Sequence, residues 1–168
     1  LEHLLYPLFH RQLCKQFEKA QLQTAYNIYA CDSLREAYNS RFSTSSITLY
    51  TSSEIRPVLS KEKNAGFVTS YLGNLGIGRS DSLVEIANAL QNLSPALYLD
   101  VYGKIPNKTV QGAFDACKGI HYNGLIPYDQ VIDVMHRSDL LIHAESFDPF
   151  YREDLKFAFS TKIADSLA

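Results

Sequence analysis

The chain has 168 residues, 46% of them apolar and 20% charged, which is typical of a globular protein with one domain or parts of two. Its net charge of −2 argues against broad binding to nucleic acids or to membrane surfaces. No run of about 18 apolar residues occurs, so no membrane-spanning helix is predicted. Three widely spaced cysteines fit neither a disulfide framework nor a zinc site, and they indicate reduced thiols: Cys14, Cys31 and Cys117.

The first part of the chain predicts two helices and two short strands. Apolar residues recur every four positions near its start: Leu5, Phe9, Leu13 and Phe17. This spacing predicts an amphipathic helix over about 7–21, with Pro7 in its first turn. A strand is expected over 24–31, and the helix after it has Ser33 and Glu36 at the spacing of a capping box.

A short strand over 47–50 and an irregular segment over 51–64 complete this region. The segment holds serines, a proline and basic residues without periodicity, which predicts either a linker between two lobes or a long surface loop. We therefore expect residues 1–60 to be the end of one lobe with its linker, and residues 61–168 to be a second domain.

Strands and helices alternate regularly after the linker. Strands are predicted at four places: 66–72, 96–102, 119–123 and 139–144. Helices are predicted between and after them: 81–93, 107–117, from Pro127 onward, and from Ser160 or Thr161 to the end. This alternation predicts an α/β fold, with a Rossmann-like parallel sheet of order 3-2-1-4 and flanking helices. The chain lacks an initiator Met and ends in mid-pattern, so we expect a piece of a longer protein that continues past Ala168.

The stretch after the first of these strands has features of a phosphate-binding turn. Three glycines follow the strand: Gly73, Gly76 and Gly78. Arg79 and the capping cluster Ser80-Asp81-Ser82 then begin a helix. Free backbone N–H groups, the helix dipole and the cation all favour an anion at such a place. The spacing matches neither GxGxxG nor the P-loop, and an ordinary βα turn that binds nothing fits the same residues.

A second loop, 145–159, follows the fourth strand and delivers Ser160, Thr161 and Lys162 to a helix start. In a sheet of the predicted order, ligands bind outside the carboxyl ends of the first and fourth strands. Two hydroxyls, free N–H groups and an ammonium can face one anion there, and together with Arg79 they suit a diphosphate better than a carboxylate. The alternative is a plain Ser/Thr cap with Lys162 in solvent.

Acidic residues near the same edge are candidates for sugar contacts. Asp165, one helical turn beyond Thr161, can accept hydrogen bonds from a ribose diol, although a lone Asp on a helix is more often solvated. Glu145 and Asp148 can hydrogen-bond a sugar or simply lie on a surface loop. For His143, a structural place at the rim is favoured over catalysis. No catalytic Ser/His/Asp or Cys/His set and no metal-ligand spacing can be placed.

Four pieces of the second region resemble a known family: TSYLGNLGIGRSDSLVEIANAL, ALYLDVYG, IHYNGLIPYDQVIDVMHRSDLLIHAESFD and FSTKIADSLA. They are similar to the retaining glycosyltransferases of family 4, also called group 1, which have the two-lobed GT-B fold. The third piece is the most specific, with its G-x-I/V-P-hydrophobic turn, its helix and its SDLLI strand. The resemblance covers about 65–168 well and 1–60 weakly.

The resemblance implies an incomplete donor-binding C-terminal lobe of the GT-B fold and a remnant of the N-terminal lobe. It assigns five residues to the diphosphate of a nucleotide-sugar: Gly73, Arg79, Ser160, Thr161 and Lys162. It assigns four to the base and ribose: Gly124, Leu125, Ile126 and Asp165. Glu145 and Asp148 are left as candidates for the sugar itself, and the catalytic residues stay unassigned.

Two departures from the family bear on the function. The family often has two glutamates separated by seven residues, whereas here Asp165 takes the place of the second and Phe157 stands where the first would be. The acceptor site and the catalytic groups of the N-terminal lobe are not in the chain. We therefore do not expect this chain to be active alone.

The function that the resemblance implies is glycosyl transfer in bacterial polysaccharide synthesis, in the cytoplasm or at the inner face of the membrane. A hexose would pass with retention from a UDP- or GDP-linked donor to a glycan or glycolipid, without a metal or a nucleic acid. The alternative is a non-catalytic α/β binding or interaction module with a degenerate nucleotide site. A receiver-like signalling domain is disfavoured, because the first strand of the second region ends in Leu72-Gly73 rather than in acidic residues.

Overall fold

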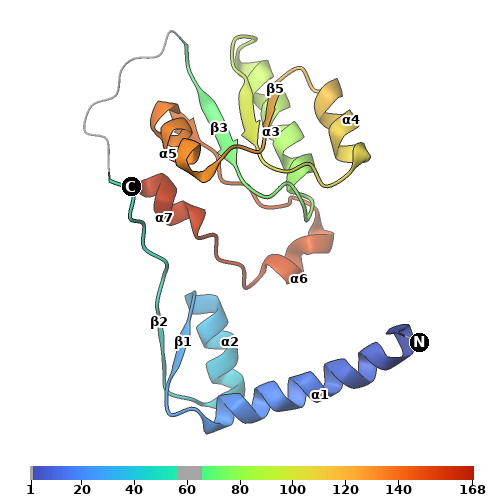
Figure 1. The fold of residues 1–168 in the computed structure, drawn as a ribbon, viewed down its shortest axis with the longest axis vertical. Helices are drawn as coiled ribbons and strands as arrows, with labels where there is room; N and C mark the ends of the chain where they lie inside the picture. The colour runs from blue at the N-terminus through green and yellow to red at the C-terminus, as the bar shows by residue number, and fades with distance from the viewer. Residues whose placement is uncertain (1, 57–65) are drawn as a thin grey trace. The chain divides into compact units, whose positions relative to one another are not determined.

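The computed structural model describes residues 2–56 and 66–168 and divides the chain into two compact units (Figure 1). The first unit comprises Leu1–Ser52 and Lys156–Ser160. The second comprises Ser53–Leu155 and Thr161–Ala168. The domain boundary expected at residue 60 and the second half of the expected linker lie outside the described residues, so that boundary stays a prediction.

The first unit is built on a two-stranded parallel sheet. Its elements in chain order are α1 (Glu2–Gln23), β1 (Asn27–Tyr29), α2 (Asp32–Phe42) and β2 (Ser46–Thr48). The two helices and two strands are those expected, but α1 begins at Glu2, so the prediction of Pro7 in its first turn is wrong. Pro7 removes one backbone hydrogen bond inside the helix, and a helix of 22 residues continues in spite of that loss.

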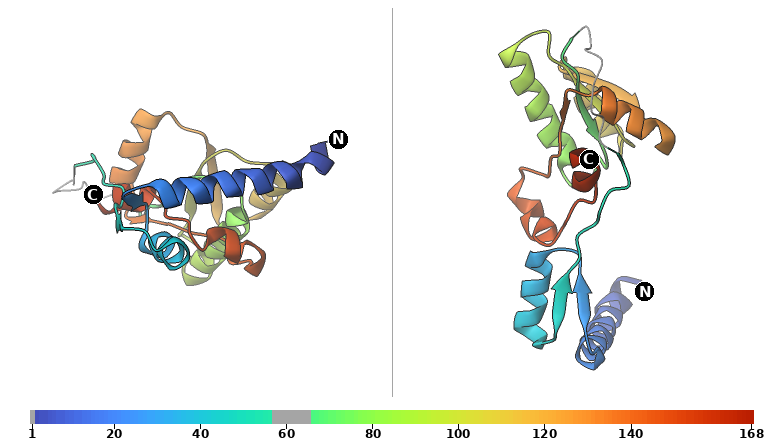
Figure 2. Two further views of the ribbon diagram at one scale, coloured as in Figure 1. Left: turned by 90° about the horizontal axis from the view of Figure 1, so that it is seen from below. Right: turned by 90° about the vertical axis from the view of Figure 1, so that its left-hand side faces the viewer.

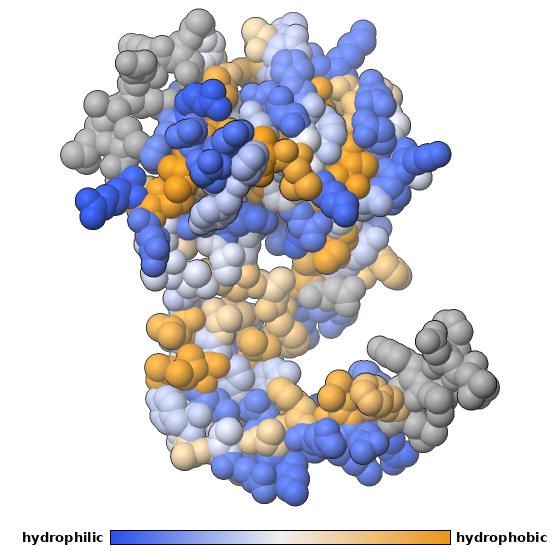
Figure 3. All heavy atoms as spheres, in the orientation of Figure 1, coloured by the Kyte–Doolittle hydropathy of each residue, from blue (hydrophilic) through white to orange (hydrophobic). Residues whose placement is uncertain are grey.

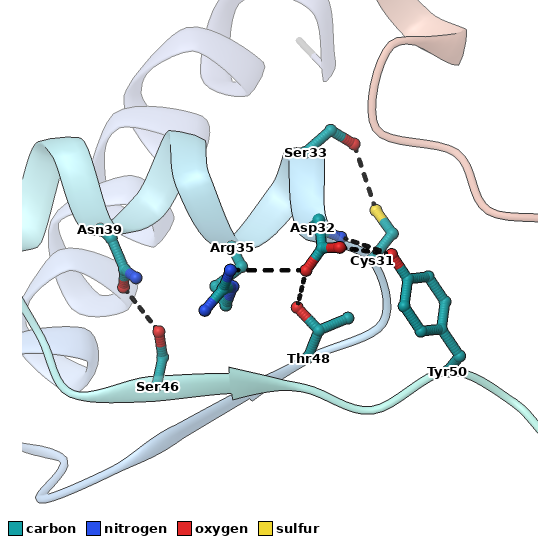
Figure 4. A network of polar contacts seen from close by, with 8 residues as sticks. All are labelled: Cys31, Asp32, Ser33, Arg35, Asn39, Ser46, Thr48 and Tyr50. Atoms are coloured by element: carbon teal, nitrogen blue, oxygen red, sulfur yellow. Dashed lines mark hydrogen bonds and ion pairs between the residues drawn. The ribbon is translucent and has the colours of Figure 1, made fainter.

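The capping box predicted for α2 is absent, because the residues around its start bind elsewhere (Figure 4). The N-cap is Cys31, which makes no side-chain cap hydrogen bond. Asp32 accepts hydrogen bonds from the hydroxyls of Thr48 at 2.5 Å and Tyr50 at 2.8 Å, and these bonds lower the pKa of its carboxyl group. Asp32 thereby links the start of α2 to the end of β2.

The sheet of the first unit is covered on one face by α2. Tyr29 is buried there and its ring stacks on that of Tyr38 with the centroids 5.4 Å apart. The other face exposes four large apolar side chains: Tyr26, Ile28, Ile47 and Leu49. Helix α1 also has one apolar and one hydrophilic side, as Figure 3 shows, and Phe9 and Leu13 are exposed on it. The apolar surface of this unit is therefore only partly covered.

The second unit contains a four-stranded parallel sheet of order β5-β4-β3-β6. Its strands are β3 (Thr69–Leu72), β4 (Leu99–Tyr102), β5 (Ile120–Gly124) and β6 (Leu140–Leu141). In sequence terms this is the predicted order 3-2-1-4, which is confirmed. β3 and β4 begin later than expected, and β6 ends at Leu141 rather than at the expected Ala144, so it pairs with β3 through only Leu140 and Leu141.

Helices pack on both faces of this sheet. The helical elements of this unit are α3 (Arg79–Leu93), α4 (Lys108–Ala116), α5 (Tyr128–Arg137), the 3-10 turn η1 (Pro149–Tyr151), α6 (Arg152–Leu155) and α7 (Lys162–Leu167). α3 and α5 lie on opposite faces, as the right-hand view of Figure 2 shows. The helix expected from Asn107 is confirmed, since the Asn107 side chain accepts a hydrogen bond from the Val110 N–H. The core between sheet and helices includes Leu75, Leu83, Leu99 and Val101, all fully buried.

None of the three cysteines forms a disulfide. Within residues 2–56 and 66–168, no helix combines the length and the apolar character needed to cross a bilayer.

Candidate functional site

A cavity of about 730 Å³ lies at the carboxyl edge of the four-stranded sheet. Its wall comes from the ends of β3, β4 and β6, the segment after β5, and the helices α5 and α7. Most of the wall is apolar, and its polar side chains belong to Asn74, Lys104, His143, Lys162, Asp165 and Ser166 and to two tyrosines, Tyr102 and Tyr128. A cavity of this size and mixed lining is typical of a site for a small organic ligand.

Gly73 ends β3 and lines the cavity, and a side chain there would collide with its neighbours. A Cβ atom on Gly73 would stand 2.9 Å from Nζ of Lys162 and 2.9 Å from the hydroxyl of Tyr71. The Gly73 N–H donates to the carbonyl of Tyr102 at 2.9 Å, which fixes the turn against β4. Glycine is therefore needed here so that the Lys162 ammonium can approach the turn.

The predicted capping cluster does not cap α3. The N-cap is Gly78, with φ of 68°, and the helix begins at Arg79. Ser80 and Ser82 are buried within the first turn, and Ser82 Oγ accepts a hydrogen bond from the Phe147 N–H at 2.9 Å. The prediction failed because Ser82 binds the loop after β6 instead of its own helix. This bond brings the two loops expected at the site together.

Ile77, beside Gly78, also has a left-handed backbone, with φ of 56°. A β-branched residue rarely takes this conformation, which costs about 1–3 kcal/mol where it occurs. Such strain is concentrated at functional turns, so the glycine turn is more unusual than its sequence indicates.

Four ionisable residues gather at the cavity: Arg79, His143, Glu145 and Lys162. Of these, His143 and Lys162 line it. Nη2 of Arg79 lies 2.6 Å from Oε2 of Glu145, and Nε2 of His143 lies 3.6 Å from Oε1 of the same carboxylate. Burial, and secondly the charge of Arg79, lowers the pKa of Lys162, while Glu145 acts in the opposite direction. Burial also raises the pKa of Tyr71 to about 12, and its hydroxyl donates to the carbonyl of Asn74. The structure thus brings the two predicted cations, Arg79 and Lys162, to one place.

The residues expected at the base and ribose come from two places, the end of β5 and the helix α7. Gly124 ends β5 with φ of 74°, and its carbonyl accepts from the Gly103 N–H. Leu125 and Ile126 line the cavity, as does Asp165, whose Oδ1 accepts a hydrogen bond from the Ser53 hydroxyl at 2.7 Å. Leu125, Ile126 and Asp165 thus share one cavity with Lys162, whereas Gly124 is not part of its lining.

Other expected residues have different surroundings. Asp148 caps η1 by accepting a hydrogen bond from the Phe150 N–H at 2.8 Å, and it is not part of the cavity lining. Thr161 stands at the N-cap of α7 but makes no side-chain cap hydrogen bond, so a Ser/Thr cap is not formed there. Ser160 belongs to the first unit, and its part in the site stays a prediction.

The sequence arguments missed several polar residues of the lining, among them Lys104 and Tyr128. Lys104 directly follows Gly103 at the carboxyl end of β4, so the rule that ligands bind at that edge could have found it. Among the described residues, no three or more His, Cys, Asp or Glu side chains gather in a way that could hold a metal ion.

The fold is similar to that of TarM, a glycosyltransferase. A crystal structure of TarM matches with a TM-score of 0.60 at 15% sequence identity, over 76% of this chain and 26% of the TarM chain. A mutant of S. aureus TarM in complex with fondaparinux, alpha-GlcNAc-glycerol and UDP matches with a TM-score of 0.58 at 13% identity and the same coverage. The α/β fold expected from the sequence is thereby confirmed.

The chain spans about a quarter of the TarM chains that it matches. No family model and no curated protein sequence matches it. The similarity is therefore one of fold, and the assignment to family 4 and to a retaining mechanism stays a prediction.

Proposed function

We propose that the cavity binds a nucleoside diphosphate sugar and that the chain is part of a glycosyltransferase. The observation that carries the proposal is the position of Lys162, an exposed residue whose ammonium lies against the turn after β3 with Arg79 nearby. Two cations gathered at the carboxyl edge between β3 and β6 form a site for a strongly charged anion. The UDP present in a TarM complex of the same fold supports this choice of ligand.

A diphosphate suits the two cations better than a singly charged ligand. Partial desolvation and the neighbouring charge of Arg79 both disfavour the Lys162 ammonium, and its lowered pKa reflects that cost. A diphosphate supplies several oxygens and enough charge to satisfy both Lys162 and Arg79. The diphosphate would lie at Gly73 and Lys162, with Thr161 as a further predicted contact.

The remaining wall suits a nucleoside. Leu125 and Ile126 would meet the base with backbone groups, and the exposed ring of Tyr128 is available to stack on it. Asp165 would accept hydrogen bonds from the ribose diol. The base, uracil or guanine, follows from neither the residue types nor the shape.

In sugar transfer the same cations would act on the leaving group. Negative charge develops on the diphosphate as the bond to the sugar breaks, and fixed cations stabilise that charge without a metal. We propose transfer with retention to a glycan or glycolipid acceptor, in the cytoplasm of a bacterium, as the sequence resemblance implies. No catalytic residue is assigned.

Calorimetric titration with UDP and GDP tests the proposal. We expect one nucleotide to bind, and Lys162→Ala to weaken that binding at least about tenfold, since a charge-assisted hydrogen bond contributes about 1.5–3 kcal/mol. Lys118→Ala is the matched control, because Lys118 is exposed and precedes β5 at the other edge of the sheet. The absence of binding by both nucleotides, or equal affinity of the Lys162→Ala protein, would refute the donor site.

A further inference from the structure

Glu145 forms an ion pair with Arg79, the cation that the proposed function assigns to a phosphate. Its Oε2 lies 2.6 Å from Nη2 of Arg79, with the arginine side chain only 15% exposed and the glutamate 33% exposed. We infer that Glu145 is an internal counter-ion, which occupies Arg79 in the empty site and is displaced when the diphosphate binds. This inference rests on the proposed function and adds a specificity-determining residue to it.

The contact between Glu145 and Arg79 has the geometry of an exchangeable ion pair. Arginine binds carboxylates most strongly through two parallel hydrogen bonds. Here the ion pair joins one guanidinium nitrogen to Oε2, and no hydrogen-bond donor of the described residues is aligned with that buried oxygen. A phosphate, with oxygens on several sides, can satisfy the guanidinium better than this carboxylate does.

The charges around the site explain why the pair forms and why an anion would break it. Burial lowers the pKa of Lys162 most, Arg79 lowers it further, and Glu145 raises it, so the carboxylate makes two neighbouring cations compatible while no ligand is bound. A bound diphosphate would take over that role with more charge. Glu145 would then face a like charge at short range, which is unfavourable.

A second partner for Glu145 is already in place. Nε2 of His143, a residue of the cavity wall, lies 3.6 Å from Oε1 of Glu145. The groups that face the carboxylate are thus Arg79 on α3, Lys162 on α7 and His143 after β6, with the phenol of Tyr71 also sensitive to its charge. When Glu145 leaves Arg79, the contact with His143 can keep it at the rim.

This exchange would make the site selective for charge. An anion must compete with Glu145 for Arg79, so a ligand with one phosphate gains less from binding than a diphosphate does. Removing the carboxylate charge should therefore tighten anion binding. Replacing a side chain that is needed only for folding would instead weaken anion binding.

The test is calorimetric titration of the wild-type protein and the Glu145→Gln variant with UDP and inorganic pyrophosphate. We expect Glu145→Gln to tighten both ligands about tenfold, because it removes a competing like charge. Glu85→Gln is the matched control: Glu85 is an exposed carboxylate on α3, the helix that carries Arg79. It removes the same net charge and should leave both affinities within about twofold.

A direct measurement covers the case in which Glu145→Gln does not fold. In wild-type protein labelled with ¹³C at the glutamate carboxyl groups, pyrophosphate should shift the Glu145 resonance and leave that of Glu85 unchanged. A Glu145→Gln protein with unchanged or weaker affinity, or an unmoved Glu145 resonance at saturation, would overturn the inference. If wild-type protein binds neither UDP nor pyrophosphate, the proposed function itself fails.

Discussion

Lys162 and Tyr71 meet at the turn after β3, where desolvation favours the neutral form of each side chain. It lowers the pKa of the ammonium and raises the pKa of the phenol to about 12. Both groups lie against the place where a Cβ of Gly73 would stand. The proposed diphosphate would reverse the balance for Lys162 only, so the lysine, and not the tyrosine, would select the anion.

The raised pKa of Tyr71 predicts a loss of stability at high pH. Its contribution to the free energy of unfolding is complete below the unfolded pKa of 10.0 and is lost as the pH rises to about 12. Since one pKa unit corresponds to about 1.4 kcal/mol, we expect a loss of about 1–2 kcal/mol by pH 12. Urea unfolding of wild-type and Tyr71→Phe proteins at pH 9 and pH 12 measures it, since the shift of Lys162 is common to both. A stability difference between the two proteins that is the same at both pH values would contradict the assignment.

The cations of the site could be predicted from sequence, whereas their pairing could not. Arg79 and Lys162 follow from strand order, because the loops after β3 and β6 must end at the same edge. The pairing of Arg79 with Glu145 depends on how two loops pack their side chains. Sequence spacing contains no information about that packing, and Glu145 was accordingly predicted only as a contact of the sugar.

At the scale of elements, the loop after β6 is held to the start of α3 by a buried hydroxyl in addition to the ion pair of Arg79 with Glu145. Ser82 is 1% exposed and accepts the Phe147 N–H. Periodicity predicted the four strands and the helices α3, α4, α5 and α7 of the second unit in the correct order, but it missed the short η1 and α6, which the sequence assigned to a loop. It failed at the start of α3, because a serine next to an acidic residue has the same pattern whether it caps its own helix or binds a distant loop.

Ser82→Ala should therefore loosen the loop that carries Glu145. The Phe147 N–H would lose its partner in a half-buried place, which costs about 1–3 kcal/mol of the free energy of unfolding. Hydrogen exchange of the Phe147 amide should be faster in the variant, and urea unfolding gives the change in stability. Asn92→Ala is the control, because Asn92 is exposed on the same helix and its replacement should change stability by less than about 0.5 kcal/mol. Equal exchange rates at Phe147 in both variants would exclude the role of Ser82.

At the scale of the whole molecule, the sheets of the two units differ in how many of their faces are covered. The sheet of the second unit has helices on both faces, whereas that of the first has one face with exposed apolar side chains. Parallel sheets are usually covered on both faces. The similarity to TarM extends over 76% of this chain, and every residue of the candidate cavity belongs to the second unit.

This division predicts that damage to the interior of the first unit leaves ligand binding intact. Tyr29 is 7% exposed and stacks on Tyr38, so Tyr29→Ala should lower the stability of the first unit by about 3 kcal/mol. Hydrogen exchange should show lost protection in β1 and α2 and native protection in β3 and β4. UDP affinity, measured by calorimetry, should stay within about twofold, since no residue of the first unit lines the cavity.

Ile28→Thr, a change at the neighbouring exposed position, is the control and should alter neither protection nor affinity. A Tyr29→Ala protein that loses UDP binding together with the protection of β1 would show that the two units fold and function as one.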